Sequence, residues 1–144
     1  EAFPTIIPTR DPLLSLITRH KRHDDWSHEF IVEGFCELAR LADNSNVEFM
    51  PLDLMTDEDV RMDSFEMMCH HCGIEFDDFS QEYVKSWKPQ NSRPDKYNFK
   101  QMYNDRDAAG IRKVLGEDYD ILRSKSNVIR PFLQKLGYKD LIWW

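Results

Sequence analysis

The feature that most constrains the fold is the tripeptide Arg10-Asp11-Pro12, which separates an apolar stretch from an amphipathic one. Residues 3–8 are mostly apolar and are typical of a short buried strand. Proline fixes φ near the helical value and lacks an N–H that a first-turn residue could not pair, so Pro12 is predicted at the first helical position with Asp11 as the N-cap. The sequence therefore predicts a strand that passes directly into a helix over residues 12–22.

This junction has the chemistry of an anion-binding site. A helix N-terminus offers free N–H groups and the positive end of the helix dipole, and the guanidinium of Arg10 adds a cation that pairs well with phosphate. Thr18 follows Arg10 by eight residues, just over two helical turns, so its hydroxyl is able to face the same side as the guanidinium. The alternatives are that Arg10 bonds loop carbonyls or pairs with Asp11 and Asp24, and that Thr18 bonds a carbonyl one turn earlier.

The following residues alternate between helical and strand patterns. The sequence predicts a helix over 26–43, a strand over 47–50, and helices over 63–72 and 79–87. Asp24 or Asp25 is expected to cap the first of these helices, and Gly73 to end the helix over 63–72 in the left-handed conformation. A strand, helices and a second strand are the order of a parallel crossover, so we expect an α/β fold with a parallel sheet flanked by helices.

Three segments of this part resemble the sulfotransferase family. The strand, the Arg-Asp-Pro junction and the hydroxyl of Thr18 are similar to the family's segment that binds the 3′-phosphate of its donor nucleotide. Residues 47–54 are similar to its next strand, which usually ends in an aromatic residue before Glu-Asp-Leu, and residues 63–76 are similar to its helix that closes in Leu-Gly-Ile-x-Phe. The resemblance implies a partial P-loop-like sulfotransferase fold in which Arg10 and Thr18 bind 3′-phosphoadenosine-5′-phosphosulfate as the donor substrate.

The other half of such a domain has no counterpart in the sequence. In the family, a glycine-rich loop for the 5′-phosphosulfate precedes the Arg-Asp-Pro segment, but here only nine residues stand before Arg10, and none of the five glycines opens such a loop. Pro51 also replaces an aromatic residue that often packs near the nucleotide. We therefore expect residues 1–94 to be the C-terminal half of a sulfotransferase-like α/β domain, truncated or processed before Glu1.

Residues 95–144 are predicted to form a helical cap packed on residues 1–94. The periodicity predicts helices over 97–104, 107–115 and 119–136, with glycines 116 and 137 as terminators. Trp143 and Trp144 end the chain with a large apolar surface that solvent disfavours. The pair either docks into the body of the protein or marks the surface of a protein partner.

Composition narrows the ligand class. Nineteen basic and twenty-six acidic residues give a net charge of −7, which argues against a general nucleic-acid binder. The basic residues gathered at 19–23 suit a small anionic ligand, or form a solvated helix end. Three cysteines make a poor disulfide framework, and no run of apolar residues is long enough to span a membrane. We expect a soluble intracellular protein without membrane contact, unless a targeting signal precedes Glu1.

The segment 69–72, Cys-His-His-Cys, contains residue types that bind zinc. On a helix, Cys69 and Cys72 share a face while the two histidines diverge, and no second cysteine or histidine pair supplies the remaining ligands. Packing of the two thiols in an apolar stripe explains them without a metal. We expect Cys69 and Cys72 to be unbridged and free of metal.

Two functional classes fit the sequence. One is an enzyme that transfers a sulfuryl group from 3′-phosphoadenosine-5′-phosphosulfate to a hydroxyl or amine acceptor, once an upstream half completes it. The other is a non-catalytic sulfotransferase-like structural or interaction module. No catalytic residue is assigned: His20, His23 and His28 have suitable chemistry, but nothing orients them on a nucleophile, and each is expected at the surface.

Overall fold

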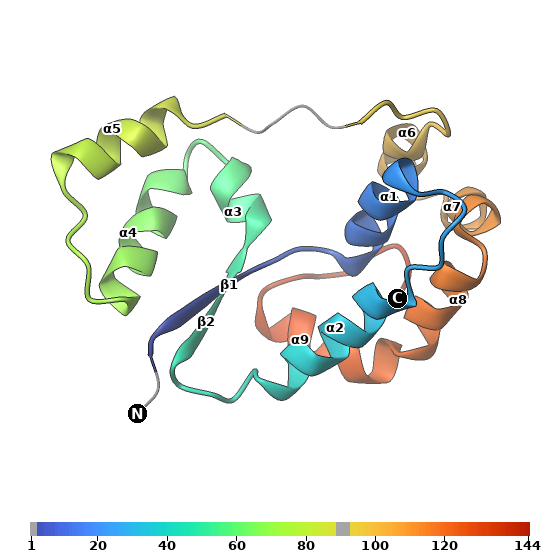
Figure 1. Cartoon of the computed structure of the whole chain (residues 1–144), viewed down its shortest axis with the longest axis horizontal. Coiled ribbons are helices and arrows are strands. Elements are labelled where there is room, and N and C mark those ends of the chain that lie inside the picture. Colours follow the sequence, from blue (N-terminus) through green and yellow to red (C-terminus); the bar gives the residue numbers. More distant parts are fainter. Residues whose placement is uncertain (1–2, 89–92) are drawn as a thin grey trace. The chain divides into compact units, whose positions relative to one another are not determined.

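The computed structural model describes residues 3–88 and 93–144, which form two compact units (Figure 1). The first unit takes its described residues from Glu1–Arg10 and Asp43–Asn91, and the second from Asp11–Ala42 and Ser92–Trp144. Each unit is therefore built from two separate stretches of chain. The predicted division at residue 94 rests on the resemblance to a family domain and stays a prediction. The two compact units are defined instead by which residues contact each other.

The first unit is a small α/β layer. Its two strands pair in parallel, with Thr5 opposite Val47 and Thr9 opposite Pro51, which confirms the predicted pairing. One helix, α4, packs on the second strand and on the two shorter helices around it. The elements are β1 (Thr5–Thr9), β2 (Val47–Pro51), α3 (Leu52–Thr56), α4 (Arg61–His71) and α5 (Asp78–Ser86).

Local sequence rules account for the end of α4 and the start of α5. Gly73 follows α4 with φ +68°, which confirms its predicted left-handed role. Asp77 caps α5 by accepting a hydrogen bond from the N–H of Ser80 at 2.8 Å. The sequence did not predict α3, because five residues make little more than one turn and show no apolar period.

The second unit is all helical. Helices α1 and α2 pack on each other; α1 also contacts α7 and α8, and α2 contacts α8 and α9. The helices after residue 94 thus pack on α1 and α2. The core consists of apolar side chains from most of these helices and from the C-terminus, among them Leu13, Leu16, Val32, Phe99, Ile111, Leu122, Ile129, Leu133 and Trp143. The elements are α1 (Pro12–Arg22), α2 (Glu29–Arg40), α6 (Phe99–Asn104), α7 (Ala108–Leu115), α8 (Glu117–Ser124) and α9 (Ser126–Lys135).

The helix predicted over 119–136 is two helices, and this prediction was wrong. The chain leaves helical geometry at Lys125, between α8 and α9. Serines flank the break, and the hydroxyl of Ser124 donates a hydrogen bond to the carbonyl of Ile121 at 2.6 Å. Serine favours helix ends because its side chain competes for backbone groups. The apolar period continues across the break, so periodicity alone predicts one continuous helix.

The start of α2 also differs from its prediction. The helix begins at Glu29 rather than residue 26, and neither Asp24 nor Asp25 caps it. Asp24 instead accepts hydrogen bonds from the ammonium of Lys96 at 2.6 Å and the hydroxyl of Tyr97 at 3.0 Å.

A distant carboxylate holds the first turn of α2. Asp118, on α8, accepts the N–H of His28 with both oxygens at 3.1 Å, and the hydroxyl of Ser27 donates to it at 3.3 Å. This carboxylate is buried, and it comes from 90 residues further along the chain.

Candidate functional site

The junction at Arg10 has the local geometry that the sequence predicts. β1 ends at Thr9, Arg10 follows directly, and α1 begins at Pro12. Asp11 is the N-cap of α1, and its Oδ1 accepts a hydrogen bond from the N–H of Leu13 at 2.9 Å. The predicted place of Arg10 at the C-terminal end of a parallel strand is therefore confirmed, and its side chain is half-buried.

The carboxylate of Asp11 gathers three donors inside the second unit. Besides capping Leu13, its Oδ1 accepts the indole N–H of Trp143 at 2.8 Å, and its Oδ2 accepts the hydroxyl of Tyr103 at 2.6 Å. Only 2% of Asp11 is exposed, so all three contacts are shielded from water. Hydrogen bonds to a buried carboxylate are among the stronger ones in proteins, and Asp11 therefore joins the start of α1 to the end of the chain.

This arrangement changes what the first turn of α1 offers an anion. The N–H of Leu13 is bonded to the Asp11 side chain, the N–H of Leu14 is bonded to the Asp11 carbonyl at 3.0 Å, and Pro12 has none. The free N–H groups expected at this helix N-terminus are thus already used. Of the groups predicted to recognise a phosphate here, the guanidinium of Arg10 is the one that carries a full positive charge.

Thr18 lies in the second turn of α1 and is half-buried. Its hydroxyl donates a hydrogen bond to the carbonyl of Leu14 at 2.9 Å, which is the alternative given by the sequence. The hydroxyl proton is therefore engaged within the helix. An anion would gain a donor here only after the Thr18 hydroxyl rotates away from Leu14.

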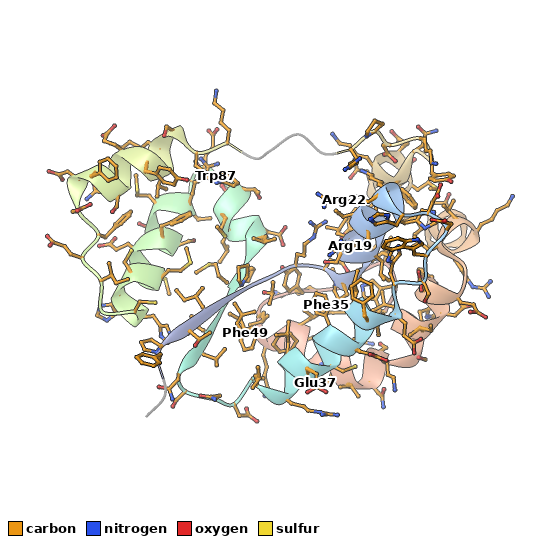
Figure 2. All side chains as sticks on the ribbon, viewed as in Figure 1. Arg19, Arg22, Phe35, Glu37, Phe49 and Trp87 are labelled. Atoms are coloured by element: carbon orange, nitrogen blue, oxygen red, sulfur yellow. The ribbon has the colours of Figure 1, made fainter. Side chains whose placement is uncertain are left out.

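The basic cluster at residues 19–23 forms the last turn of α1. Arg19 and Arg22 extend from consecutive turns and are exposed (Figure 2), and the Arg19 guanidinium lies 5.8 Å from the ring centre of Phe30. Basic side chains at a helix C-terminus are stabilised by the helix dipole. The solvated helix end, one of the two alternatives, explains this placement without a ligand.

Two of the histidines predicted at the surface are buried, and that prediction was wrong. His20 packs against the rings of Tyr97 and Phe99, and burial lowers its pKa, an effect that Asp24 partly opposes. His28 is only 1% exposed, and its Nε2 lies 2.9 Å from the carbonyl of His23. A carbonyl only accepts, so Nε2 carries a proton, and Nδ1 has no hydrogen-bond partner among the described residues.

The terminal tryptophans dock into the second unit. Trp143 is fully buried, which confirms the docking alternative for this residue. Trp144 is half-buried, with the guanidinium of Arg130 5.0 Å from the centre of its ring. Trp143 is thus a core residue and presents no surface to a partner.

The cysteines are unbridged thiols. Cys36, Cys69 and Cys72 are each half-buried. Across residues 3–88 and 93–144, no group of three histidine, cysteine, aspartate or glutamate side chains is placed to hold a metal ion.

Arg61 is a buried cation that the sequence analysis did not single out. Its guanidinium donates hydrogen bonds to three backbone carbonyls: Met55 at 2.7 Å, and Thr56 and Trp87 at 3.3 Å each. It also lies 5.0 Å from the ring centre of Trp87, which Figure 2 labels. These contacts tie the ends of α3 and α5 to α4, so the role of Arg61 is structural. In the sequence, the one signal for this role was that Arg61 is a basic residue within the acidic segment 53–66.

A larger hollow lies on the first unit, between α4 and β2. It has a volume of about 530 Å³ and is lined by Glu48, Met50, Asp63, Glu66, Met67, His70 and His71. A smaller cavity of about 250 Å³ lies beside Arg61 and α5. In the sequence, His70 and His71 indicate only a candidate zinc site, and no pattern predicts a groove.

Comparisons with known proteins leave the family assignment as a proposal. No protein-family model, curated protein or solved structure matches the chain. Within the part that the structure describes, no helix is both long enough and apolar enough to traverse a bilayer.

Proposed function

We propose that the chain is the 3′-phosphate-binding part of a sulfotransferase-like protein. Completed by a part that binds the 5′-phosphosulfate, it would transfer a sulfuryl group from 3′-phosphoadenosine-5′-phosphosulfate to a hydroxyl or amine acceptor. The observation that supports this proposal is the junction itself: a parallel strand ends at Thr9, Arg10 follows, and a helix begins at Pro12. This is the order of elements that the resemblance to the family implies.

Arg10 has the central role in the proposal. A 3′-phosphate carries roughly two negative charges at neutral pH and accepts two parallel hydrogen bonds from a guanidinium. Asp11 and Pro12 leave the first-turn N–H groups of α1 unavailable for a ligand. In the proposal, the guanidinium of Arg10 therefore binds the phosphate in place of these N–H groups. Thr18 adds one hydrogen bond after its hydroxyl leaves the carbonyl of Leu14.

The proposal assigns this chain to donor binding. Sulfuryl transfer also requires a base for the acceptor and cations near the leaving phosphate. The buried histidines are poor candidates for that base, because His20 packs against aromatic rings and the protonated nitrogen of His28 is bonded to His23. Those catalytic groups would come from the other part of the protein.

Calorimetric titration of two nucleotides tests the proposal. Adenosine 3′,5′-bisphosphate should bind the full-length gene product about ten- to a hundredfold more tightly than AMP, because one charge-assisted bidentate contact contributes about 1.5–3 kcal/mol. Arg10→Ala should remove most of this preference, and Thr18→Ala should reduce it less. Arg40→Ala is the matched control, because Arg40 is exposed and pairs with Glu37 one turn away.

The double variant tests whether both side chains contact the same ligand. Groups that share one phosphate should give non-additive losses in a double-mutant cycle. Equal affinity for the two nucleotides, or no binding of either, would contradict the proposal. The non-catalytic structural or interaction module would then be the better account.

A further inference from the structure

The groove between α4 and β2 combines apolar and acidic side chains in a regular arrangement. Glu48 and Met50 lie two residues apart on β2, so they project from the same face of the sheet. The α4 residues of the groove recur at helical spacing and form one stripe: Asp63, Glu66, Met67, His70 and His71. The strand and the helix thus each contribute one methionine and at least one carboxylate to the lining of the groove.

The groove has one exposed apolar side chain. Met67 is 64% exposed although it lines the hollow, whereas Met50 is only 4% exposed. Methionine is flexible and polarizable, and it is common at surfaces that bind helical partners. Met67 therefore offers an adaptable apolar contact beside the carboxylates of the groove.

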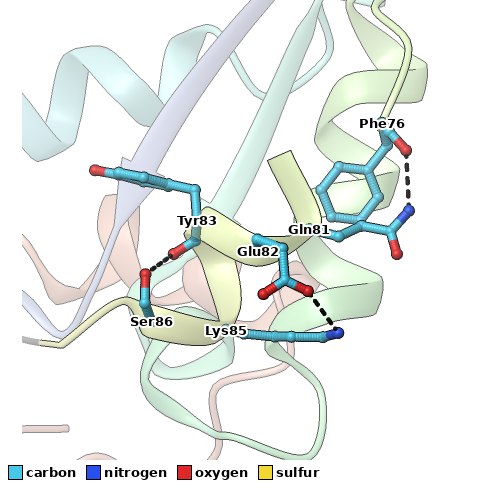
Figure 3. Close-up of polar contacts among 6 residues, drawn as sticks. All are labelled: Phe76, Gln81, Glu82, Tyr83, Lys85 and Ser86. Carbon is cyan, nitrogen blue, oxygen red and sulfur yellow. Dashed lines mark hydrogen bonds and ion pairs between the residues drawn. The ribbon is translucent and has the colours of Figure 1, made fainter. Parts of the chain in front are cut away.

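Charge points to the chemistry of the partner. The described residues of the first unit include twelve aspartates and glutamates against four lysines and arginines. Arg61 is committed to backbone carbonyls, and the ammonium of Lys85 pairs with Glu82 at 3.2 Å (Figure 3). No lysine or arginine lines the groove. Glu48, Asp63 and Glu66 therefore present an unbalanced negative rim around an apolar floor.

We propose that this groove binds a basic amphipathic helix of a partner protein. Apolar side chains of the partner would pack on the exposed Met67, and its lysines or arginines would pair with Glu48, Asp63 and Glu66. The stripe from Asp63 to His71 runs about 12 Å along α4, which matches about two turns of a partner helix. Complementary charges would set the orientation, and the contact with Met67 would add affinity that does not depend on charge.

Designed peptides test this inference directly. The probe is an 18-residue amphipathic helix of leucine and lysine, and its counterpart carries glutamate in place of lysine. Fluorescence anisotropy should show saturable binding of the leucine–lysine peptide and none of the leucine–glutamate peptide. Hydrogen exchange should slow in residues 61–71 on binding, since these residues form α4.

Matched variants distinguish binding of the peptide in the groove from nonspecific electrostatic attraction to an acidic protein. Asp63→Lys with Glu66→Lys should weaken the leucine–lysine peptide at least tenfold, and Met67→Gln about fivefold without any change of charge. Glu75→Lys is the control, because Glu75 is exposed and does not line the groove; it should change affinity less than twofold. Circular dichroism of each variant checks that the fold is retained.

Three results would overturn the inference. The first is no binding of the leucine–lysine peptide at 100 μM, and the second is an equal loss in the groove variants and in Glu75→Lys. The third is self-association of the chain through this face in sedimentation without peptide, which would assign the groove to a second copy. The outcome is independent of nucleotide binding, because neither Arg10 nor Thr18 lines the groove.

Discussion

At the scale of single residues, burial decides what the histidines and Asp11 do. His20 and His28 lie next to the basic end of α1, where the sequence favours solvent exposure, yet both are almost fully buried. Desolvation disfavours the charged imidazolium, so the pKa of His20 falls below its usual value, although Asp24 and Asp118 oppose this and His28 and Lys96 add to it. Asp11 is buried too, but three hydrogen-bond donors stabilise its carboxylate.

The lowered pKa of His20 predicts a pH dependence of stability. A base whose pKa is lower in the folded than in the unfolded state binds its proton preferentially after unfolding. The contribution of neutral His20 is therefore full well above pH 6.5, the ordinary value, and is lost as the pH falls from there through the lower folded pKa. In His20→Gln, urea unfolding should show a smaller loss of stability between pH 7.5 and pH 5 than in the wild type. His70→Gln, at an exposed position, should keep the wild-type slope, and an unchanged slope in His20→Gln would refute the assignment.

At the scale of elements, long-range capping sets where α2 begins. Asp24 and Asp25 stand at the right place in the sequence, but Asp24 is occupied by Lys96 and Tyr97. The carboxylate of Asp118 arrives from α8 and accepts the N–H of His28 instead. α2 thus depends on the packing of α8 against it, which the contacts between these two helices confirm.

Removal of this cap should destabilise the second unit. Asp118→Ala leaves the buried N–H of His28 without its acceptor, and we expect a loss of about 1–3 kcal/mol in the free energy of unfolding, measured with urea. Asp118→Asn keeps one acceptor oxygen and should recover part of the loss. Asp120→Ala is the matched control on the same helix, where Asp120 makes an exposed ion pair with Arg112 that contributes little to stability because water screens it. Equal effects of the two alanine variants would show that Asp118 does not act as the cap.

At the scale of the whole molecule, the chain divides into units of different charge and construction. The first unit is strongly acidic, whereas the described part of the second has fifteen lysines and arginines against thirteen aspartates and glutamates. The excess of acidic residues therefore lies in the first unit, and the described part of the second unit is slightly basic. In the second unit, the chain's C-terminal segment completes the core, because Trp143 is buried and bonded to Asp11.

Truncation of the Trp143 side chain should affect one unit only. Trp143→Ala removes a fully buried indole and one of the two N–H donors to Oδ1 of Asp11, at a cost of about 3–5 kcal/mol. Hydrogen exchange should accelerate in α1 and α7–α9, while α4 of the first unit keeps its wild-type protection. Trp26→Ala, which removes an exposed indole of the second unit, is the control and should leave both units protected. Loss of protection in α4 as well would mean that the two units unfold together.

The sequence by itself determined the features that depend on neighbouring residues. Pro12 and Asp11 start α1 at the predicted residue, Gly73 ends α4, and the apolar runs at β1 and β2 predicted parallel strands. A cap, a left-handed glycine and an apolar period each act within about one turn or a few strand residues, so their physical causes lie in the local sequence.

Only the tertiary structure decided which polar groups meet. The bond from Trp143 to Asp11 spans 132 residues and that from Asp118 to His28 spans 90, and no local pattern records either distance. The same packing buries His20 against Tyr97 and Phe99, which follow it by more than 70 residues. The groove on α4 also follows from packing, because its carboxylates and methionines become neighbours only where a strand and a helix face each other.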